Sequence, residues 1–248
     1  MTKKILITGA TKGIGWALAQ KAYSYGYDVI LHGRNATELQ QRKLELAPQG
    51  ERCTTVCFDV RDRKILEQEL QKIDRLNVLV NNAGTIADNW WSKMTDEQWD
   101  TVIATDLTGV YNVTSRLTAK IVPGGHIVNI TSQAGLKGNP GQANYSAAKA
   151  ALVGMTYTLA AELKRKQIYV NAVAPPAAIT AMTRPVLEKF RQKNGSLPSM
   201  WQLGTAAQVA DFIIQHVLST QKTGQVLAVN GTRQGYWLPA QYQRMEER

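Results

Sequence analysis

Short apolar runs alternate with longer segments of helical periodicity along most of the chain. The apolar runs predict strands at 4–8, 28–32, 54–58, 77–81, 126–131, 169–174 and 226–230. The intervening pattern predicts helices at 14–25, 36–47, 62–73, 96–119, 145–165 and 205–218. Most of the strands are continuously apolar, as is typical of strands that helices cover on both faces. We therefore expect an α/β fold: one doubly wound, Rossmann-type parallel sheet of about seven strands with helices on both faces.

The length of 248 residues suits one domain. We expect residues 1–248 to form a single dinucleotide-binding and catalytic domain. Residues 176–204 break the alternation and contain three prolines. Long irregular segments in compact domains are often lids or binding loops, so we expect a substrate loop there. Residues 232–248 show no clear periodicity and are interpreted as a C-terminal extension.

The composition argues against several classes of protein. Two cysteines and three scattered histidines offer too few ligands for a metal centre, so no metal site is predicted. No apolar run approaches the roughly 20 residues that a membrane span needs. The apolar run that follows the two N-terminal lysines is too short for a signal peptide. We expect a cytoplasmic enzyme.

The net charge of +10 has two interpretations. It can be an ordinary solvated surface, or it can serve an anionic partner such as a phosphorylated cofactor or an acidic carrier protein. No block of five or six like charges occurs, which disfavours nucleic acid. Lys164, Arg165 and Lys166 form a cluster that suits an acidic acyl carrier protein. Cations at a helix C-terminus are equally favoured by the helix dipole.

A glycine-rich segment, Thr8-Gly9-Ala10-Thr11-Lys12-Gly13-Ile14-Gly15, connects the first strand to a helix. Glycines at such a junction let the backbone approach a pyrophosphate, which the helix N-terminus attracts. A simple turn is the alternative, but the position after the first strand favours a dinucleotide. The second strand ends without a carboxylate for the ribose of NAD. Arg34 and Lys12 suit a 2′-phosphate instead, so NADPH is favoured over NADH.

Tyr145 and Lys149 are spaced to share one face of a helix. A nearby ammonium favours the phenolate, so we expect Lys149 to lower the pKa of Tyr145 toward working pH. Ser132 follows a strand at the sheet edge where such folds place ligands, and its hydroxyl can form hydrogen bonds with a substrate carbonyl and with the tyrosine oxygen. A capping serine is the alternative. The three residues predict proton transfer to or from an alcohol or ketone.

These segments resemble the classical short-chain dehydrogenase/reductase family over about residues 3–231. The motifs occur in the family's order, as Thr8-Gly9-x3-Gly13-x-Gly15, Asp59-Val60, Asn81-Asn82-Ala83-Gly84, Ser132, Tyr145-x3-Lys149 and Asn171-x-Val173-Ala174-Pro175. Residues 138–145 are most similar to those of 3-oxoacyl-[acyl-carrier-protein] reductases. The resemblance implies reduction of a 3-oxoacyl thioester, linked to carrier protein or CoA, by NADPH.

The resemblance also implies roles for residues at the family's motif positions. Ser132, Tyr145 and Lys149 would be catalytic, as would Asp106 at the position of the family's asparagine, and Ser132, Gln142 and Tyr145 would contact substrate. The cofactor would be bound by Gly9, Thr11, Lys12, Gly13, Ile14, Gly15, Arg34, Asp59, Val60, Asn81, Ala83, Gly84, Tyr145, Lys149, Pro175, Ala178 and Thr180. Family members are commonly tetramers built on the helices at 96–119 and 145–165, so a homo-oligomer, dimer or tetramer, is expected.

Three departures from the family pattern stand out. Asp106 replaces the usual asparagine, which helps to hold a water in the proton relay to the lysine. We expect the relay to survive, because that water mainly needs an acceptor. Pro175-Pro176 replaces the usual Pro-Gly, and Asn230-Gly231-Thr232 replaces a double glycine.

Two other functions stay open. The same chemistry can act on a sugar, steroid, quinone or other carbonyl, and Trp90, Trp91 and Trp201 are candidate pocket walls. The chain can also be a weakly catalytic, cofactor-binding subunit of a hetero-oligomer.

Overall fold

The computed structural model describes residues 2–175, 188, 192, 195, 204–230 and 233–237. The predictions for residues 176–204 and 232–248 therefore fall largely outside the described residues. So do the predicted roles of Ala178, Thr180 and Trp201 and the exchange at Pro176.

Eight described strands form one sheet in the order β3-β2-β1-β4-β5-β6-β7-β8. They are β1 (Lys4–Ile7), β2 (Asp28–Gly33), β3 (Cys53–Cys57), β4 (Leu76–Asn81), β5 (Ile121–Ile130), β6 (Tyr169–Ala174), β7 (Val226–Asn230) and β8 (Arg233–Tyr236). The first seven are parallel, and β8 pairs antiparallel with β7. The predicted doubly wound α/β fold is confirmed.

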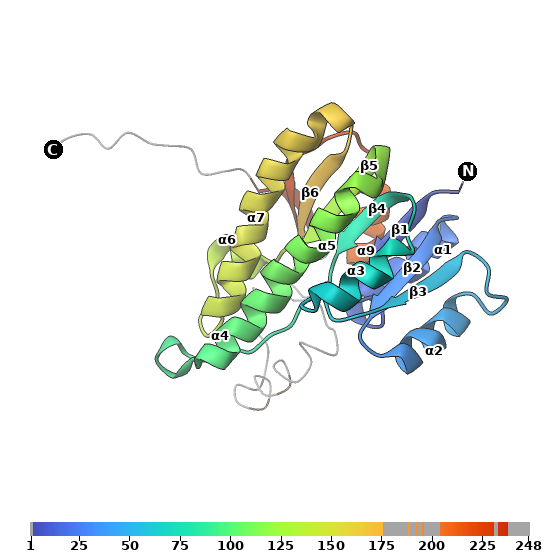
Figure 1. Cartoon of the computed structure of the whole chain (residues 1–248). Helices are drawn as coiled ribbons and strands as arrows, with labels where there is room; N and C mark the ends of the chain where they lie inside the picture. Colours follow the sequence, from blue (N-terminus) through green and yellow to red (C-terminus); the bar gives the residue numbers. More distant parts are fainter. Residues whose placement is uncertain are drawn as a thin grey trace.

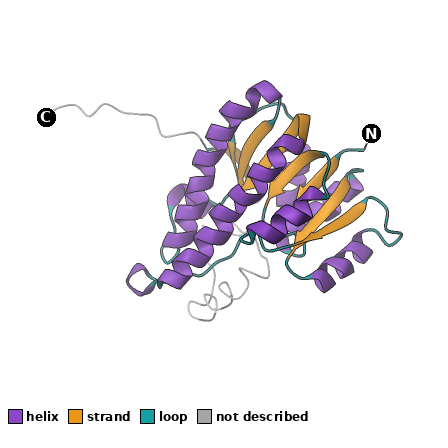
Figure 2. Cartoon of the chain, viewed as in Figure 1, coloured by secondary structure: helices purple, strands orange, loops and turns teal. Residues whose placement is uncertain are grey.

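Helices cover both faces of the sheet (Figures 1 and 2). One layer contains α1 (Gly13–Ser24), α2 (Ala36–Leu46) and α9 (Ala206–Phe212). The other contains α3 (Arg63–Gln71), α4 (Asp96–Ile103), α5 (Gly109–Leu117) and α7 (Ala143–Leu163), with the short α6 (Gln133–Lys137) beside α7. Alternate residues of a strand point to opposite faces, so Ile5 and Ile7 pack in one core and Leu6 in the other.

Two differences from the predicted elements have local causes. β5 begins at Ile121, earlier than predicted, because Pro123 and the two glycines after it weaken the strand signal. The predicted helix at 96–119 is divided by a π-helical turn at Ala104–Thr108, which joins α4 to α5. Such turns often occur at functional sites, and this one carries Asp106.

Candidate active site

Tyr145 and Lys149 lie one turn apart near the start of α7. The Lys149 Nζ atom is 5.5 Å from the centroid of the Tyr145 ring. Lys149 is only 3% exposed, and its ammonium donates a hydrogen bond to the Ile130 carbonyl at 3.1 Å. That carbonyl belongs to the last residue of β5. The two residues share one helix, as the spacing predicted, and that helix brings both side chains to the carboxyl edge of the sheet.

Ser132 follows β5 at the same edge. It is the N-cap of α6, and its hydroxyl accepts a hydrogen bond from the Ala134 N–H at 3.2 Å. A hydrogen bond between Ser132 and the Tyr145 hydroxyl also lowers the pKa of Tyr145. Ser132 thus has both features that the sequence suggested: it caps a helix, and it lies beside the tyrosine oxygen.

Asp106 contacts Lys149 directly. Its side chain is fully buried, and the Oδ2 atom is 3.1 Å from the Lys149 Nζ atom. The Oδ1 atom accepts a hydrogen bond from the Thr85 N–H at 2.7 Å. A Cβ atom on Gly84 would lie 2.7 Å from Oδ2, so a side chain there would displace the carboxylate. The substitution of aspartate for the family's asparagine therefore produces a buried ion pair.

The charges around this ion pair set the protonation of the site. Burial alone would lower the pKa of Lys149, but the Asp106 carboxylate and the Tyr145 hydroxyl raise it on balance. Burial raises the pKa of Asp106, although the Lys149 ammonium opposes that shift. Lys149 is thus held as an ammonium ion, and the Asp106 carboxylate balances its charge.

The prediction that Tyr145 has a lowered pKa is wrong for this structure. Burial raises the pKa of Tyr145, and the charges of Asp106 and Asp88 raise it further. Lys149 lowers the pKa, as expected, but the ammonium and the hydrogen bond with Ser132 do not offset the other causes. Burial is the largest of these causes, and the local sequence pattern gave no signal of it. The Tyr145 hydroxyl therefore keeps its proton at neutral pH.

The glycine-rich loop fits a diphosphate. A Cβ atom on Gly15 would collide with the Gly9 carbonyl oxygen, so only glycine permits the close packing of this turn. The Asn82 Nδ2 atom donates hydrogen bonds to the carbonyls of Thr8 at 2.9 Å and Gly9 at 3.1 Å. The N-cap residue of α1, Lys12, makes no capping hydrogen bond, and the first turn contains no acidic residue. Free N–H groups and the positive helix end can therefore face an anion.

Three side chains meet where the adenosine end of a dinucleotide would lie. The Arg61 guanidinium donates to the Asp59 carboxylate at 2.8 Å, and Arg34 Nη1 lies 3.8 Å from the same Asp59 group. The hydrogen bond from Arg61 is the main reason that the pKa of Asp59 is lowered. The sequence predicted Arg34 and Asp59 but missed Arg61, whose position two residues after Asp59 was the available signal. Lys12 is exposed on the neighbouring loop.

The segment after β4 connects the glycine-rich loop to Asp106, which contacts Lys149. The Ala83 N–H donates to the Thr8 hydroxyl at 2.9 Å, and Gly84 lies against Asp106. Asn81, by contrast, is buried among protein side chains. Its Nδ2 atom donates hydrogen bonds to Thr114 Oγ1 at 2.9 Å and to Asn129 Oδ1 at 2.8 Å. Asn81 thus ties β4 to the neighbouring strand β5 and to α5, while the residues after it connect the glycine-rich loop to Asp106.

The expected substrate residue Gln142 precedes α7 and holds the loop that follows β4. Its Nε2 atom donates to Asp88 Oδ2 at 2.8 Å. Asn144 is fully buried, and its Nδ2 atom donates to the carbonyls of Ala87 and Gln98, each at 3.0 Å. The sequence assigned Asn144 no role. These bonds fasten the loop beside Tyr145, and Trp90 lies in the same loop with 65% of its surface exposed.

Pro175, an expected cofactor-binding residue, is buried directly after β6. Among the described residues, no three His, Cys, Asp or Glu side chains are grouped as metal ligands. Within the same part of the chain, no helix combines the length and apolar character needed to cross a bilayer.

Comparisons with known proteins agree with this geometry. The family model for short chain dehydrogenase matches residues 3–190. A 3-oxoacyl-[acyl-carrier-protein] reductase FabG of Thermotoga maritima is 38% identical over 237 residues, covering 92% of this chain and 96% of the relative. Nodulation protein G of Rhizobium sp. (strain N33) is 36% identical over 238 residues with the same two coverages. The crystal structure of an actinorhodin polyketide ketoreductase variant with NADPH gives a TM-score of 0.81 at 30% identity, covering 93% of this chain and 96% of that chain.

This chain therefore belongs to the short-chain dehydrogenase family. Its members are oxidoreductases that bind NAD(P), and this protein is an enzyme of that kind. The predicted resemblance to 3-oxoacyl-[acyl-carrier-protein] reductases is confirmed at 33–38% identity.

Proposed function

We propose that the protein reduces a 3-oxoacyl thioester to the corresponding 3-hydroxyacyl thioester with NADPH, using Tyr145 as the general acid. The observation that carries this proposal is the grouping of Ser132, Tyr145 and Lys149 at the carboxyl edge of the sheet. Asp106 and Gly84 connect that group to the glycine-rich loop. The FabG relatives and the ketoreductase neighbour support the choice of a 3-oxoacyl substrate.

The chemistry of reduction assigns a task to each of these side chains. When bound, the reduced nicotinamide supplies the hydride. Tyr145 donates its proton to the ketone oxygen, and Ser132 donates a hydrogen bond to the same oxygen. Lys149 stabilises the phenolate that Tyr145 becomes. The Tyr145 hydroxyl is protonated at neutral pH, as a proton donor must be before the reaction.

A preference for NADPH rests on the guanidinium groups at the adenosine end. The Arg34 side chain is 71% exposed and lies 3.8 Å from Asp59, which is typical of a weak surface ion pair. Such pairs contribute about 0–1 kcal/mol, so Arg34 can turn to a 2′-phosphate at little cost. Arg61 keeps the Asp59 carboxylate neutralised when Arg34 moves away.

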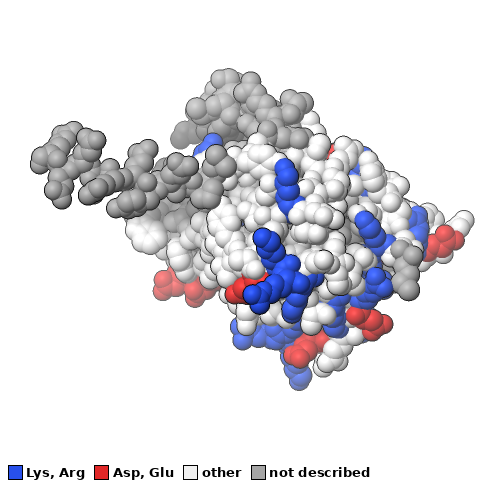
Figure 3. Space-filling view, turned by 90° about the horizontal axis from the view of Figure 1, so that it is seen from above, with Lys and Arg blue, Asp and Glu red and all other residues white. Residues whose placement is uncertain are grey.

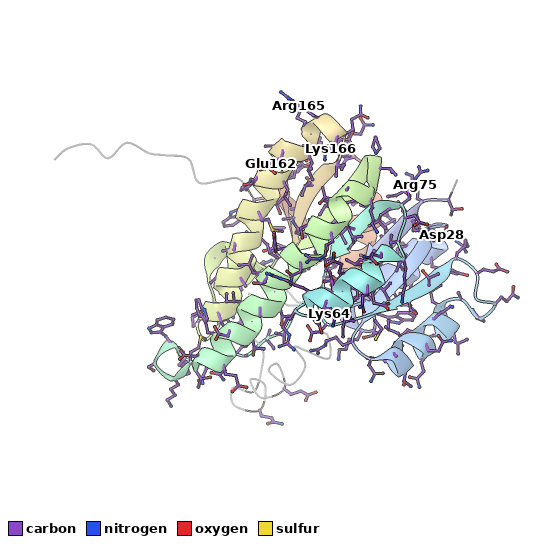
Figure 4. All side chains as sticks on the ribbon, viewed as in Figure 1. Asp28, Lys64, Arg75, Glu162, Arg165 and Lys166 are labelled. Atoms are coloured by element: carbon purple, nitrogen blue, oxygen red, sulfur yellow. The ribbon has the colours of Figure 1, made fainter. Side chains whose placement is uncertain are left out.

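Delivery by an acidic carrier protein implies a particular arrangement of subunits. Arg165 and Lys166 project at the far end of α7, and Lys and Arg side chains are prominent on that face (Figures 3 and 4). Tyr145 lies near the opposite end of the same helix, roughly 30 Å away at 1.5 Å per residue. Because this separation is large, we propose that a carrier docked at residues 164–166 serves the active site of a neighbouring copy.

The outward surface of α7 supports such a homo-oligomer. It presents a row of small residues that includes Ala147, Ala151 and Gly154, all exposed in one chain. The α5 helix contributes Tyr111, which is 54% exposed. Exposed apolar residues gathered on one side of a molecule are common at protein interfaces.

The proposal is tested by following the loss of reduced-nicotinamide absorbance with purified protein. A 3-oxoacyl thioester, a cyclic ketone, a quinone and a keto sugar are each assayed with NADPH and with NADH. The proposal expects turnover of the thioester, with NADPH preferred. If only one of the other carbonyl compounds is turned over, that compound class replaces the 3-oxoacyl thioester as the substrate. No turnover of any ketone would favour a cofactor-binding subunit without its own activity.

A further inference from the structure

The side chain of His32 bridges the carboxyl ends of three adjacent strands. His32 lies near the end of β2 and is 2% exposed. Its Nδ1 atom accepts a hydrogen bond from the N–H of Gly9, two residues after β1, at 3.1 Å. Its Nε2 atom is 3.0 Å from the carbonyl oxygen of Phe58, directly after β3. The imidazole and phenyl rings pack with their centroids 4.1 Å apart.

These two partners fix the protonation of the ring. A backbone N–H can only donate and a carbonyl oxygen can only accept, so Nδ1 is bare and Nε2 carries the proton. Burial lowers the pKa of His32 to about 4, although the bond to Phe58 raises it. At neutral pH the ring is therefore held as the one neutral tautomer that satisfies both neighbours.

Both backbone polar groups of Gly9 are held by hydrogen bonds. Its N–H donates to His32, and its carbonyl accepts from the Asn82 Nδ2 atom at 3.1 Å. The next residue, Ala10, donates its N–H to the His32 carbonyl at 2.8 Å. Gly9 has φ of +64°, a left-handed conformation that an unrestrained glycine would leave easily. His32 thus supplies two of the bonds that fix the first turn of the glycine-rich loop.

We propose that His32 is a positioning residue for the dinucleotide site, and this inference rests on the proposed function. Its ring fixes the Gly9 peptide before the cofactor arrives, so that binding does not have to order the loop. Ordering a loop on binding weakens affinity, and a prearranged loop avoids that loss. His32 acts through Gly9 and makes no part of the reaction itself.

Two substitutions separate the two ends of the imidazole. His32→Asn places an amide oxygen where Nδ1 lies, so the acceptor for Gly9 is kept. His32→Gln reaches as far as Nε2, so the bond to Phe58 is kept and the acceptor for Gly9 is lost. His32→Leu removes both bonds. If His32→Leu does not fold, the comparison of the asparagine and glutamine variants still decides the question.

The protein contains a matched control in His126. This ring is 7% exposed, packs on Tyr169 with centroids 5.2 Å apart, and burial lowers its pKa to about 4 as well. However, His126 Nδ1 has no hydrogen-bond partner in the described structure. His126 also lies four residues before the carboxyl end of β5 and contacts no part of the glycine-rich loop. His126→Leu therefore reports the effect of losing a buried histidine without disturbing Gly9.

The measurement is the dissociation constant of NADPH by titration calorimetry at pH 7.5, together with kcat at saturating NADPH. We expect His32→Gln and His32→Leu to weaken NADPH binding roughly three- to tenfold, the worth of one hydrogen bond. His32→Asn and His126→Leu should bind like the wild type, and kcat should change little in all four. Wild-type affinity in the glutamine and leucine variants, or an equal loss in His126→Leu, overturns the role of His32. Failure of the wild type to bind any nicotinamide overturns the proposed function instead.

Discussion

Asp106→Asn isolates the charge of the carboxylate beside the catalytic lysine. Asparagine has nearly the same shape, and its amide oxygen can still accept the hydrogen bond from Thr85. The change therefore restores the residue typical of the family and removes one negative charge from a buried site. Its expected effect is on protonation, because the Lys149 ammonium loses its counter-ion.

The contact distance gives the scale of the effect. Unit charges 3.1 Å apart attract each other by about 5 kcal/mol at an effective dielectric constant of about 20. Removing one partner of a buried pair typically costs about 3–5 kcal/mol of stability. For a chain of this size that corresponds to a lowering of Tm by roughly 10 °C. Burial, which lowers the pKa of Lys149, is then no longer opposed by Asp106.

The pH dependence of the reduction rate follows from the negative charge of the Asp106 carboxylate. Reduction requires a protonated Tyr145 beside a charged Lys149, and it is lost when the pair releases its first proton. Asp106 raises the pKa of both groups, so it holds that proton to higher pH. In Asp106→Asn the first proton leaves more easily, whichever residue releases it. The alkaline limit of the reduction rate therefore moves to lower pH.

The assay is kcat for ketone reduction at saturating NADPH between pH 6 and pH 10. Asp88→Asn is the control, because Asp88 also raises the pKa of Tyr145 but contributes less than Asp106. We expect a shift to lower pH in both variants, larger for Asp106→Asn. An unchanged alkaline limit, a shift to higher pH, or a larger shift in the control would refute the reasoning.

Three further predictions concern the cofactor, the carrier and acid stability. Arg34→Ala should raise KM for NADPH roughly tenfold or more while KM for NADH changes little. An equal rise in KM for both cofactors would exclude a contact between Arg34 and the 2′-phosphate of NADPH. Charge reversal at residues 164–166 should raise KM for a carrier-bound substrate only, and an equal effect on a small soluble thioester would exclude carrier docking there. Burial lowers the pKa values of His32 and His126 from 6.5 to about 4, so below pH 6.5 the unfolded chain takes up a proton at each ring that the folded protein does not. The free energy of unfolding should therefore fall by roughly 3 kcal/mol per histidine as pH falls from about 6.5 to 4. Urea unfolding of His126→Leu across this range should show a weaker pH dependence than wild type.

The strands and the catalytic pair were predictable because their signals are local. Continuous apolar runs define buried parallel strands, and the spacing of Tyr145 and Lys149 places them on one helix face. The edge strand β8 was missed because it has only four residues, one of them Gly235. A strand of four residues is too short to show a recognisable alternation of apolar and polar residues.

The electrostatics of the site could not be predicted from the sequence. The sequence showed that Asp106 replaces asparagine, but the distance to Lys149 depends on a π-helical turn and on the absence of a side chain at Gly84. The same limit applies to His32, whose partners Gly9 and Phe58 come from two other strands. Residues far apart in the chain set these contacts, so no local pattern reveals them.

The most direct test of the central claim is Tyr145→Phe, which removes one hydroxyl and keeps the ring. NADPH binding is measured by calorimetry, and ketone reduction by the loss of reduced-nicotinamide absorbance. If Tyr145 is the general acid, the variant binds NADPH within a few-fold of wild type while kcat falls by roughly 100-fold or more. Reduction at a rate close to wild type would contradict the account.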